Sequence, residues 1–144
     1  MRLSIKAANP EALEAMMGFS RYNSTTRLDK KLMELVKIRA SQINHCAFCL
    51  DMHVADAIRL GESERRLHVL AAWKESGMFT ARECAALKLT EALTLVSVAG
   101  VPDDVYDEVR ANFDEREYID LVMTINIINC WNRINNALGN EPPK

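Results

Sequence analysis

Two cysteines and a histidine lie at helical spacing near the middle of the chain: Cys46, Cys49 and His53. Residues three and four positions apart share one face of an α-helix, so this spacing predicts three neighbouring side chains. The helix would begin near Cys46, where unpaired backbone N–H groups stabilise an anion. A thiol in such a setting can have a pKa well below its ordinary value of about 8.5. The pattern therefore points to thiolate chemistry beside a histidine that can move protons.

Three interpretations of this motif stay open when only its residues are considered. In a chain without export signals, C-x-x-C is typical of a redox dithiol. A zinc site made of Cys46, Cys49 and His53 would need a fourth ligand. The remaining candidates are isolated in the sequence: His45, His68, Cys84 and Cys130. In the third interpretation the cysteines have no chemical role and only pack inside a buried helix. We expect this packing role for Cys84.

The elements that must position these residues are helices. Apolar residues follow a helical period almost from end to end, and the sustained alternation of a strand is absent. We expect an all-α, single-domain bundle of about six or seven helices over residues 1–144. Start and stop residues place helices at about 10–17, 28–43, 46–60, 63–77, 80–96, 102–109 and 114–138. Capping-box patterns at Thr80 and at Asp114 support two of these starts.

Two polar features of these helices have a simple interpretation as solvated surface. Glu34 lies beside the apolar stripe of the 28–43 helix, and taken alone it predicts a surface glutamate that pairs with Lys37. Asparagine is a poor helix former, yet the last helix contains five of them. They are Asn126, Asn129, Asn132, Asn135 and Asn136. Their number suggests hydrogen bonds to another part of the molecule, but a polar outer face is the interpretation we expect.

Composition restricts the class of protein. The chain of 144 residues is 49% hydrophobic and 26% charged, which is ordinary for a globular domain large enough to bury a core. A formal net charge of −2 offers no basic surface, so we expect neither nucleic acid nor a membrane as a partner. The N-terminus resembles no signal peptide. We therefore expect a cytoplasmic protein, in a reducing compartment where a C-x-x-C is more often catalytic than structural.

Together with Glu34, the motif resembles the alkylhydroperoxidase D core domain of the carboxymuconolactone decarboxylase family. Glu34 stands twelve residues before Cys46, and the spacing from glutamate through both cysteines to the histidine is more specific than a bare C-x-x-C. The similarity covers most of the chain, in residues 33–44, 46–53, 55–57, the helix of Trp73 and residues 129–133. It implies an all-helical fold that assembles into homo-trimers or trimer-based homo-hexamers.

The resemblance also implies a function: a thiol peroxidase that reduces hydroperoxides through a disulfide cycle without a cofactor. In that comparison Cys49 is the peroxidatic thiol, Cys46 is the resolving thiol, and His53 with Glu34 forms a proton relay. The reductant would be a dithiol, such as a lipoyl group on a partner protein. The chain departs from the pattern at Phe48, where a second histidine often stands, unless His45 replaces it. A decarboxylase-type activity on a small carbon acid, with unused cysteines, is the enzymatic alternative.

The residues alone assign the roles of attacking and resolving thiol less clearly than the resemblance does. Cys46 is nearer the expected helix start, so we expect it to be the more exposed thiol and the one more strongly stabilised as a thiolate. Cys49 has His53 one turn further along, where an imidazole can take its proton. Since peroxide reduction needs both a thiolate and a proton donor for the leaving oxygen, we follow the resemblance and expect attack by Cys49.

Overall fold

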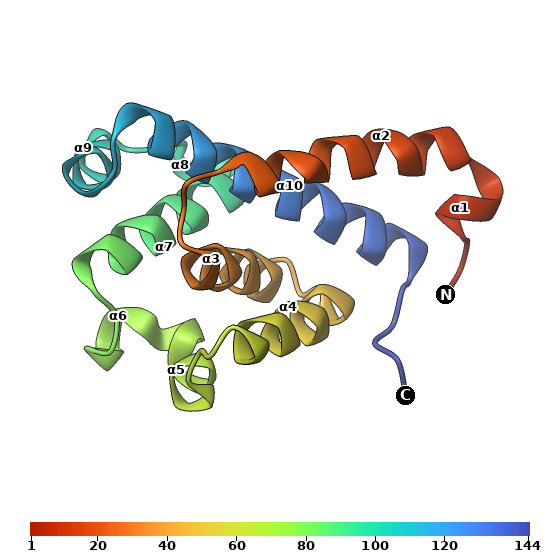
Figure 1. Cartoon of the computed structure of the whole chain (residues 1–144), viewed down its shortest axis with the longest axis horizontal. Helices are drawn as coiled ribbons and strands as arrows, with labels where there is room; N and C mark the ends of the chain where they lie inside the picture. Colours follow the sequence, from red (N-terminus) through yellow and green to blue (C-terminus); the bar gives the residue numbers. More distant parts are fainter.

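The computed structural model describes residues 1–144, and all of its regular secondary structure is helical (Figure 1). The helices are α1 (Ile5–Ala8), α2 (Pro10–Ser20), η1 (Arg21–Thr25), α3 (Lys30–Ile43), α4 (Ala47–Arg59), α5 (Glu64–Val69), η2 (Leu70–Ala72), α6 (Trp73–Ser76), α7 (Ala81–Thr94), α8 (Val96–Ala99), α9 (Asp103–Asn112) and α10 (Glu115–Leu138). The two segments labelled η are 3-10 helices. The predicted all-α class is confirmed. The assignment of residues 1–144 to one domain stays a prediction.

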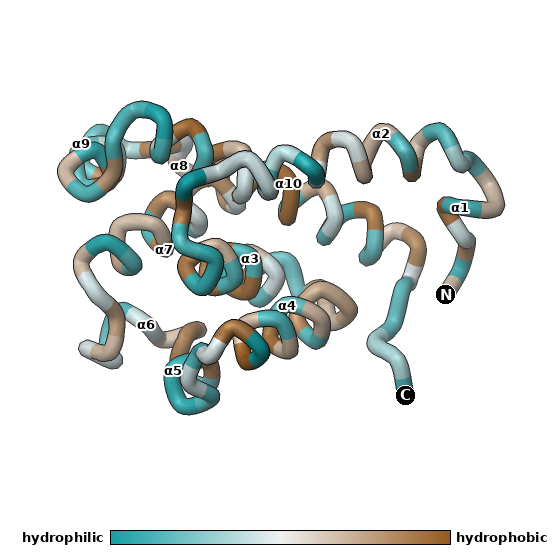
Figure 2. Tube along the Cα trace, in the orientation of Figure 1, coloured by the Kyte–Doolittle hydropathy of each residue, from teal (hydrophilic) through white to brown (hydrophobic).

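Helix α3 is the central element, and α4, α7 and α10 pack around it. It begins at Asp29, whose carboxylate accepts a hydrogen bond from the backbone N–H of Leu32. On one side Val36 packs with residues of α7, α9 and α10 in the larger core cluster. On another side Leu35 packs with Ala57 of α4 and Leu70 in a second cluster. Hydrophilic and hydrophobic residues alternate along these helices (Figure 2), as expected for helices with one buried face.

Helix α10 extends along much of the molecule and holds the N-terminal segment against it (Figure 1). The predicted capping box is present at its start, between Asp114 and Glu117. The indole N–H of Trp131 donates to the hydroxyl of Ser20, and the backbone N–H of Arg2 donates to the last helical carbonyl, on Leu138. The segment from α1 to η1 is thereby fixed at both ends.

Most predicted helix ends agree with the structure to within about three residues, although the helices expected to end at 17 and 109 continue to Ser20 and Asn112. The main difference concerns residues 63–77. There the single expected helix is divided into α5, η2 and α6 before Gly77 turns into the left-handed region. The helix expected to reach Val96 ends at Thr94, with Leu95 as its C-cap, and α8 follows as a separate turn. No helix combines the length and the apolar character that crossing a lipid bilayer would require.

Candidate active site

The turn between α3 and α4 positions the two thiols. A hydrogen bond from the N–H of Cys46 to the carbonyl of Ser41, at 3.0 Å, closes this turn. His45 adopts a φ of 52°, the left-handed conformation that non-glycine residues rarely adopt. Cys46 is then the N-cap of α4, and Cys49 lies inside its first turn. The predicted start of this helix at Cys46 is therefore correct to within one residue.

The sulfur atoms of Cys46 and Cys49 are in direct contact. Their Sγ atoms lie 2.7 Å apart, and both cysteines are free. A disulfide bond is about 2.05 Å long, so only a small movement separates this pair from a disulfide. The expectation of an exposed Cys46 is wrong: it is 1% exposed and Cys49 is 0% exposed. Ala40 of α3 and Ile128 of α10 pack against the two cysteines and cover the helix start, which the sequence analysis expected to be exposed.

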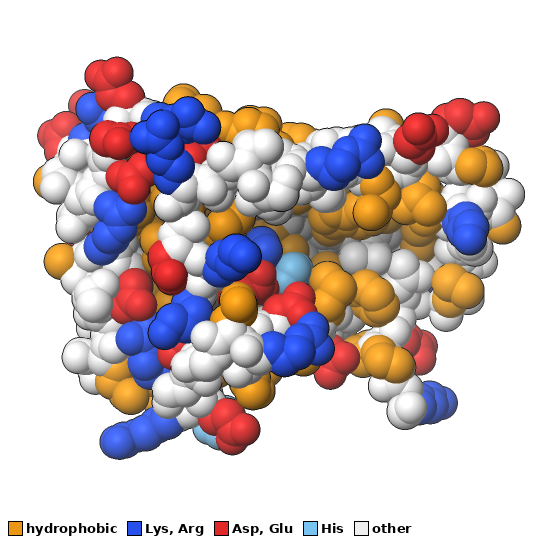
Figure 3. Space-filling view, viewed as in Figure 1, with side chains coloured by type: hydrophobic (Ala, Val, Ile, Leu, Met, Phe, Trp, Pro, Cys, Tyr) orange, Lys and Arg blue, Asp and Glu red, His pale blue; other side chains and the backbone are white.

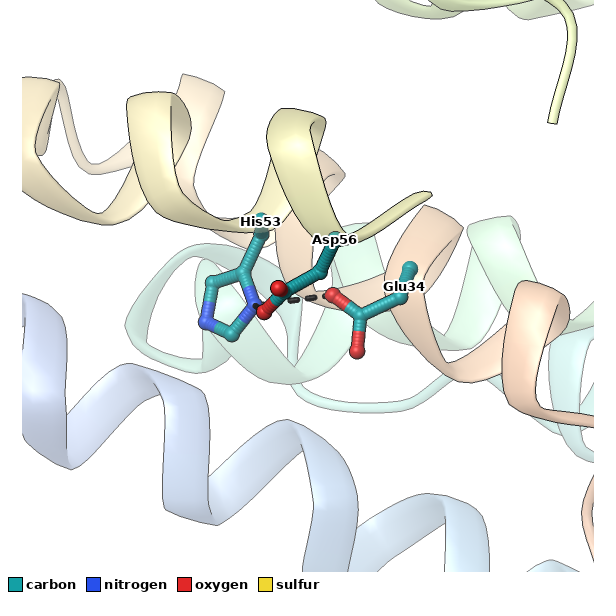
Figure 4. A group of neighbouring side chains, drawn as sticks. All are labelled: Glu34, His53 and Asp56. Atoms are coloured by element: carbon teal, nitrogen blue, oxygen red, sulfur yellow. Dashed lines mark hydrogen bonds and ion pairs between the residues drawn. The ribbon is translucent and has the colours of Figure 1, made fainter. Parts of the chain in front are cut away.

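Glu34 and His53 form a buried pair beneath α4 (Figure 4). Nδ1 of His53 lies 2.8 Å from Oε2 of Glu34, and the ammonium group of Lys37 lies 2.6 Å from the other carboxylate oxygen. The expectation of a solvated Glu34 is therefore wrong, although its predicted pairing with Lys37 is correct. The reason is that α4 packs across α3 and covers the glutamate, a contact that periodicity within one helix does not reveal.

The charge state of Glu34 determines what His53 can do. Burial alone would raise the pKa of Glu34, but the hydrogen bond from His53 and the nearby Lys37 outweigh burial and lower that pKa. Glu34 is therefore a carboxylate at neutral pH, and its hydrogen bond fixes a proton on Nδ1 of His53. The other ring nitrogen points away from both acidic side chains (Figure 4) and is left to accept a proton.

Three of the five asparagines on α10 are buried and hydrogen-bonded to the site, so the expectation of a polar outer face is wrong for them. Asn44, in the α3–α4 turn, donates to the side-chain oxygens of Asn129 and Asn132, both at 2.9 Å. Asn132 in turn donates to the hydroxyl of Ser41. Asn135 donates to Sγ of Cys49 at 3.2 Å. The remaining two asparagines, at 126 and 136, are exposed as expected.

The environment of Cys49 opposes ionisation of its thiol. Burial raises the pKa of Cys49 to about 12, and the hydrogen bond with Cys46 acts in the same direction. The side-chain amides of Asn135 and Asn132 act in the opposite direction. Cys49 is thus a neutral thiol at neutral pH, and its chemistry needs a base that takes the proton as the thiol reacts.

A cavity of about 410 Å³ adjoins this site, between the N-terminal segment and α4 and α10. In the space-filling view it is the hollow whose walls are largely hydrophobic (Figure 3). Apolar side chains from α1, α2, α4 and α10 line it, namely Ile5, Met17, Phe48, Met52, Ile127, Ile128, Trp131 and Ile134. His53 and Asn135 also line it. An apolar molecule in the cavity would therefore meet His53 and the amide that contacts Cys49.

The zinc set predicted as one alternative is not the set that the structure gathers. The candidate ligands within 4.8 Å of one another are Glu34, His53 and Asp56. Asp56 Oδ2 is 3.9 Å from Nδ1 of His53, and the two carboxylates are already paired with Lys37 and Arg59. The isolated candidates are not part of this group: His45 and His68 are exposed, while Cys84 and Cys130 are half-buried. Cys84 packs at the edge of the second core cluster, as expected.

The site also contains residues that sequence reasoning did not select. Ser41 and Asn44 form hydrogen bonds that join α3 and the α3–α4 turn to α10. The one available signal was the excess of asparagine on a long helix, because unfavourable helix formers inside a helix need a compensating contact. Nothing local to Ser41 or Asn44 distinguishes them from ordinary helix-end residues.

Comparisons with known proteins agree on one family. The carboxymuconolactone decarboxylase family model matches residues 10–92. YdfG, an uncharacterized protein of Bacillus subtilis (strain 168), is 45% identical over 140 residues that span 97% of this chain and 95% of the relative. YnjA, an uncharacterized protein of Escherichia coli (strain K12), is 34% identical over 114 residues, which span 77% of this chain and 60% of the relative.

Solved structures show the same fold. A protein of unknown function from Agrobacterium tumefaciens, a candidate antioxidant defence protein AhpD, has a TM-score of 0.96 at 36% identity, covering 99% of this chain and 98% of that one. The debrominase Bmp8 has a TM-score of 0.84 at 20% identity, covering 95% of this chain and 74% of that one, which shows a shared fold alone. With its matching sequence and AhpD-like fold, this chain belongs to the carboxymuconolactone decarboxylase family.

Proposed function

We propose that this protein is a thiol-dependent peroxidase that reduces hydroperoxides with Cys49 and Cys46, assisted by a proton relay of His53 and Glu34. The observation that carries the proposal is the contact of the two sulfur atoms at 2.7 Å at the start of α4, the helix whose His53 is paired with Glu34 of α3. A dithiol in contact can pass between thiol and disulfide forms, and a neutral imidazole on a carboxylate is a general base.

In the first step the Cys49 sulfur attacks the outer oxygen of the hydroperoxide and breaks the O–O bond. Because the pKa of Cys49 is raised, the thiol loses its proton to His53 as it reacts rather than beforehand. The protonated His53, stabilised by the Glu34 carboxylate, then gives that proton to the departing alkoxide. The products are an alcohol and a sulfenic acid on Cys49, so the sulfur is oxidised and the peroxide is reduced.

In the second step the Cys46 sulfur attacks the sulfenic acid on Cys49. An S–S bond forms, the S–O bond breaks, and water leaves with the thiol proton of Cys46. The cycle closes when an external dithiol reduces the Cys46–Cys49 disulfide and becomes a disulfide itself. A lipoyl group carried by a partner protein is a dithiol of this kind. The apolar cavity supports an organic hydroperoxide as the substrate, since its lining matches a hydrocarbon body better than a small polar peroxide.

The same proposal includes a compartment and an assembly. A dithiol cycle that depends on reduction fits the cytoplasm, where thiols are kept reduced. Several large apolar side chains are unusually exposed, among them Val98 at 78% and Val96 at 52%. Surface patches of this kind mark protein contacts, and they support assembly into homo-trimers or homo-hexamers. A monomeric mass in light scattering at micromolar concentration would contradict the proposed assembly.

Peroxide consumption in the presence of a dithiol reductant tests the proposed activity. The wild type should consume organic hydroperoxide catalytically, Cys46→Ser should stop after about one turnover per chain, and Cys49→Ser should lose the fast reaction. Neither a carbon-acid enzyme that uses only His53 and Glu34 nor a zinc protein predicts this pattern. Full activity in a variant with both cysteines replaced, or stoichiometric zinc that blocks both thiols in protein purified under reducing conditions, would overturn the proposal.

A further inference from the structure

The side-chain amide of Asn135 lies against the sulfur that the proposed reaction uses. It reaches Cys49 from α10, with Nδ2 at 3.2 Å from Sγ, and the two residues are 6% and 0% exposed. A neutral thiol accepts a hydrogen bond weakly, whereas hydrogen bonds to an ionised acceptor are about twice as strong as neutral ones. The N–H of Asn135 is thus placed where negative charge develops when Cys49 loses its proton.

The end of α10 fixes the direction in which this amide faces. Gly139 adopts a left-handed φ of 65°, which turns the chain back so that the N–H of Asn140 donates to the Asn135 carbonyl at 3.0 Å. The side-chain amide of Asn140 also donates to Oδ1 of Asn135, at 2.8 Å. With its oxygen occupied in this way, Asn135 presents its NH₂ group to the sulfur. A reversed amide would bring two NH₂ groups together and place an oxygen against the thiolate.

We propose that Asn135 is a catalytic residue whose side-chain N–H stabilises negative charge on the Cys49 sulfur, and that Asn140 is a positioning residue that orients the Asn135 amide. This inference rests on the proposed function, in which Cys49 is the attacking sulfur. A donor at this point is needed because burial disfavours the thiolate, and the Asn135 amide lowers the pKa of Cys49 against that effect. Asn135 also lines the cavity, so the same amide borders the space from which the substrate would arrive.

Alkylation of Cys49 tests this inference without requiring peroxidase activity. The rate of alkylation by iodoacetamide, read at Cys49 by mass spectrometry, is proportional to the thiolate fraction at every pH below the pKa of the thiol. One pKa unit is a tenfold change in that fraction. Loss of a hydrogen bond to a charged group should therefore slow alkylation about tenfold or more at any fixed pH in this range.

Four variants separate a role in charge stabilisation from a role in folding. Asn135→Ala removes the donor and opens space beside the sulfur, so improved access alone would make alkylation faster, not slower. Asn135→Asp keeps the side-chain volume and replaces the NH₂ group by oxygen. Alkylation of Cys49 should therefore be slower still in this variant. Asn140→Ala should slow the alkylation of Cys49 by a smaller factor. Asn126→Ala is the matched control, because Asn126 is exposed on the same helix and its side chain contacts no polar partner.

The outcomes distinguish this inference from the proposed function. The inference holds if both Asn135 variants slow alkylation and the reaction with peroxide while Asn126→Ala leaves both rates unchanged. It is overturned if Asn135→Asp, folded by circular dichroism, alkylates and consumes peroxide at wild-type rates. If neither Asn135 variant folds, a wild-type alkylation rate in Asn140→Ala overturns it. A wild-type chain that does not consume peroxide overturns the proposed function and, with it, the catalytic role of Asn135.

Discussion

Glu34 and His53 stand 19 residues apart in the chain, yet Oε2 of Glu34 and Nδ1 of His53 lie 2.8 Å apart with both side chains buried. The first comes from α3 and the second from α4, so the packing of these two helices creates the pair. A carboxylate in this position holds the histidine in one tautomer and stabilises its protonated form. In the proposed reaction the histidine takes a proton from a thiol that burial keeps neutral.

Replacement of Glu34 by Gln tests this pairing. Glu34→Gln keeps the shape of the side chain but removes the charge that stabilises protonated His53. We expect Cys49 to react with peroxide and with alkylating agents at least about tenfold more slowly at neutral pH, within the range of general-base effects. Glu115→Gln is the control, since the side chain of Glu115 is 92% exposed. An unchanged pH profile of Cys49 alkylation in Glu34→Gln would rule out the relay.

Acid should remove a part of the stability that depends on Glu34. Its pKa in the folded chain is lowered below the ordinary 4.5, so its contribution to the free energy of unfolding is present above about pH 4.5 and lost as the pH falls toward the folded-state pKa. The stability difference between the wild type and Glu34→Gln should therefore shrink on acidification, as measured by urea denaturation at a series of pH values. A difference that stays constant across that range would contradict an ionised Glu34 in the folded chain.

Asn44 should be important for stability as well as for the site. Asn44→Ala leaves the buried side-chain oxygens of Asn129 and Asn132 without their donor. Unsatisfied buried groups cost about 1–3 kcal/mol, so urea denaturation should show a loss of that size. Asn126→Ala, which removes an exposed asparagine from α10, should change the free energy of unfolding by less than about 0.5 kcal/mol. Equal effects of the two substitutions would mean that the buried asparagine network does not stabilise the α3–α4 turn.

Local sequence patterns predicted the helices because the chain marks their ends with local chemistry. Asp114 with Glu117, and Thr80 with Glu83, form the capping boxes that their spacing indicates, and Gly139 ends α10 in the left-handed region. The spacing from Cys46 to His53 likewise predicted the helix that carries them. The division of residues 63–77 was not predictable, because Gly77 is the only helix-breaking residue type in that stretch and the break before it is stabilised by packing of Leu67, Leu70 and Trp73 on α3 and α7.

The parts of the site that depend on contacts between helices were predicted wrongly from the residues alone. Glu34 and Asn132 each resemble a surface residue when only their own helix is considered, and both are buried by a second helix. Cys46 resembles an exposed helix start, yet Ile128 of α10 covers it. The family resemblance selected Glu34 as a partner of His53 where the helical pattern did not, because only the resemblance carried information about the fold.

The two cysteines should differ when each is removed. Cys46→Ser should react once with peroxide and stop as a sulfenic acid on Cys49, which dimedone traps. Cys49→Ser should lose the fast reaction, because the remaining thiol is not the one beside His53 on the same helix face. Mass spectrometry of the dimedone adduct identifies the oxidised residue. If Cys46 keeps the fast reaction when Cys49 is absent, the roles of the two thiols are reversed although the redox function stands.

The most direct test of the central claim is the state of one peptide after peroxide treatment. Trypsin releases residues 40–59 as a single peptide that contains both Cys46 and Cys49. After one equivalent of organic hydroperoxide per reduced chain, this peptide should lose the mass of two hydrogen atoms and resist alkylation, and a dithiol should restore it. Cys84 and Cys130 should stay alkylatable. Retention of both free thiols in residues 40–59 while peroxide is consumed, or no consumption at all, would contradict a Cys46–Cys49 disulfide cycle.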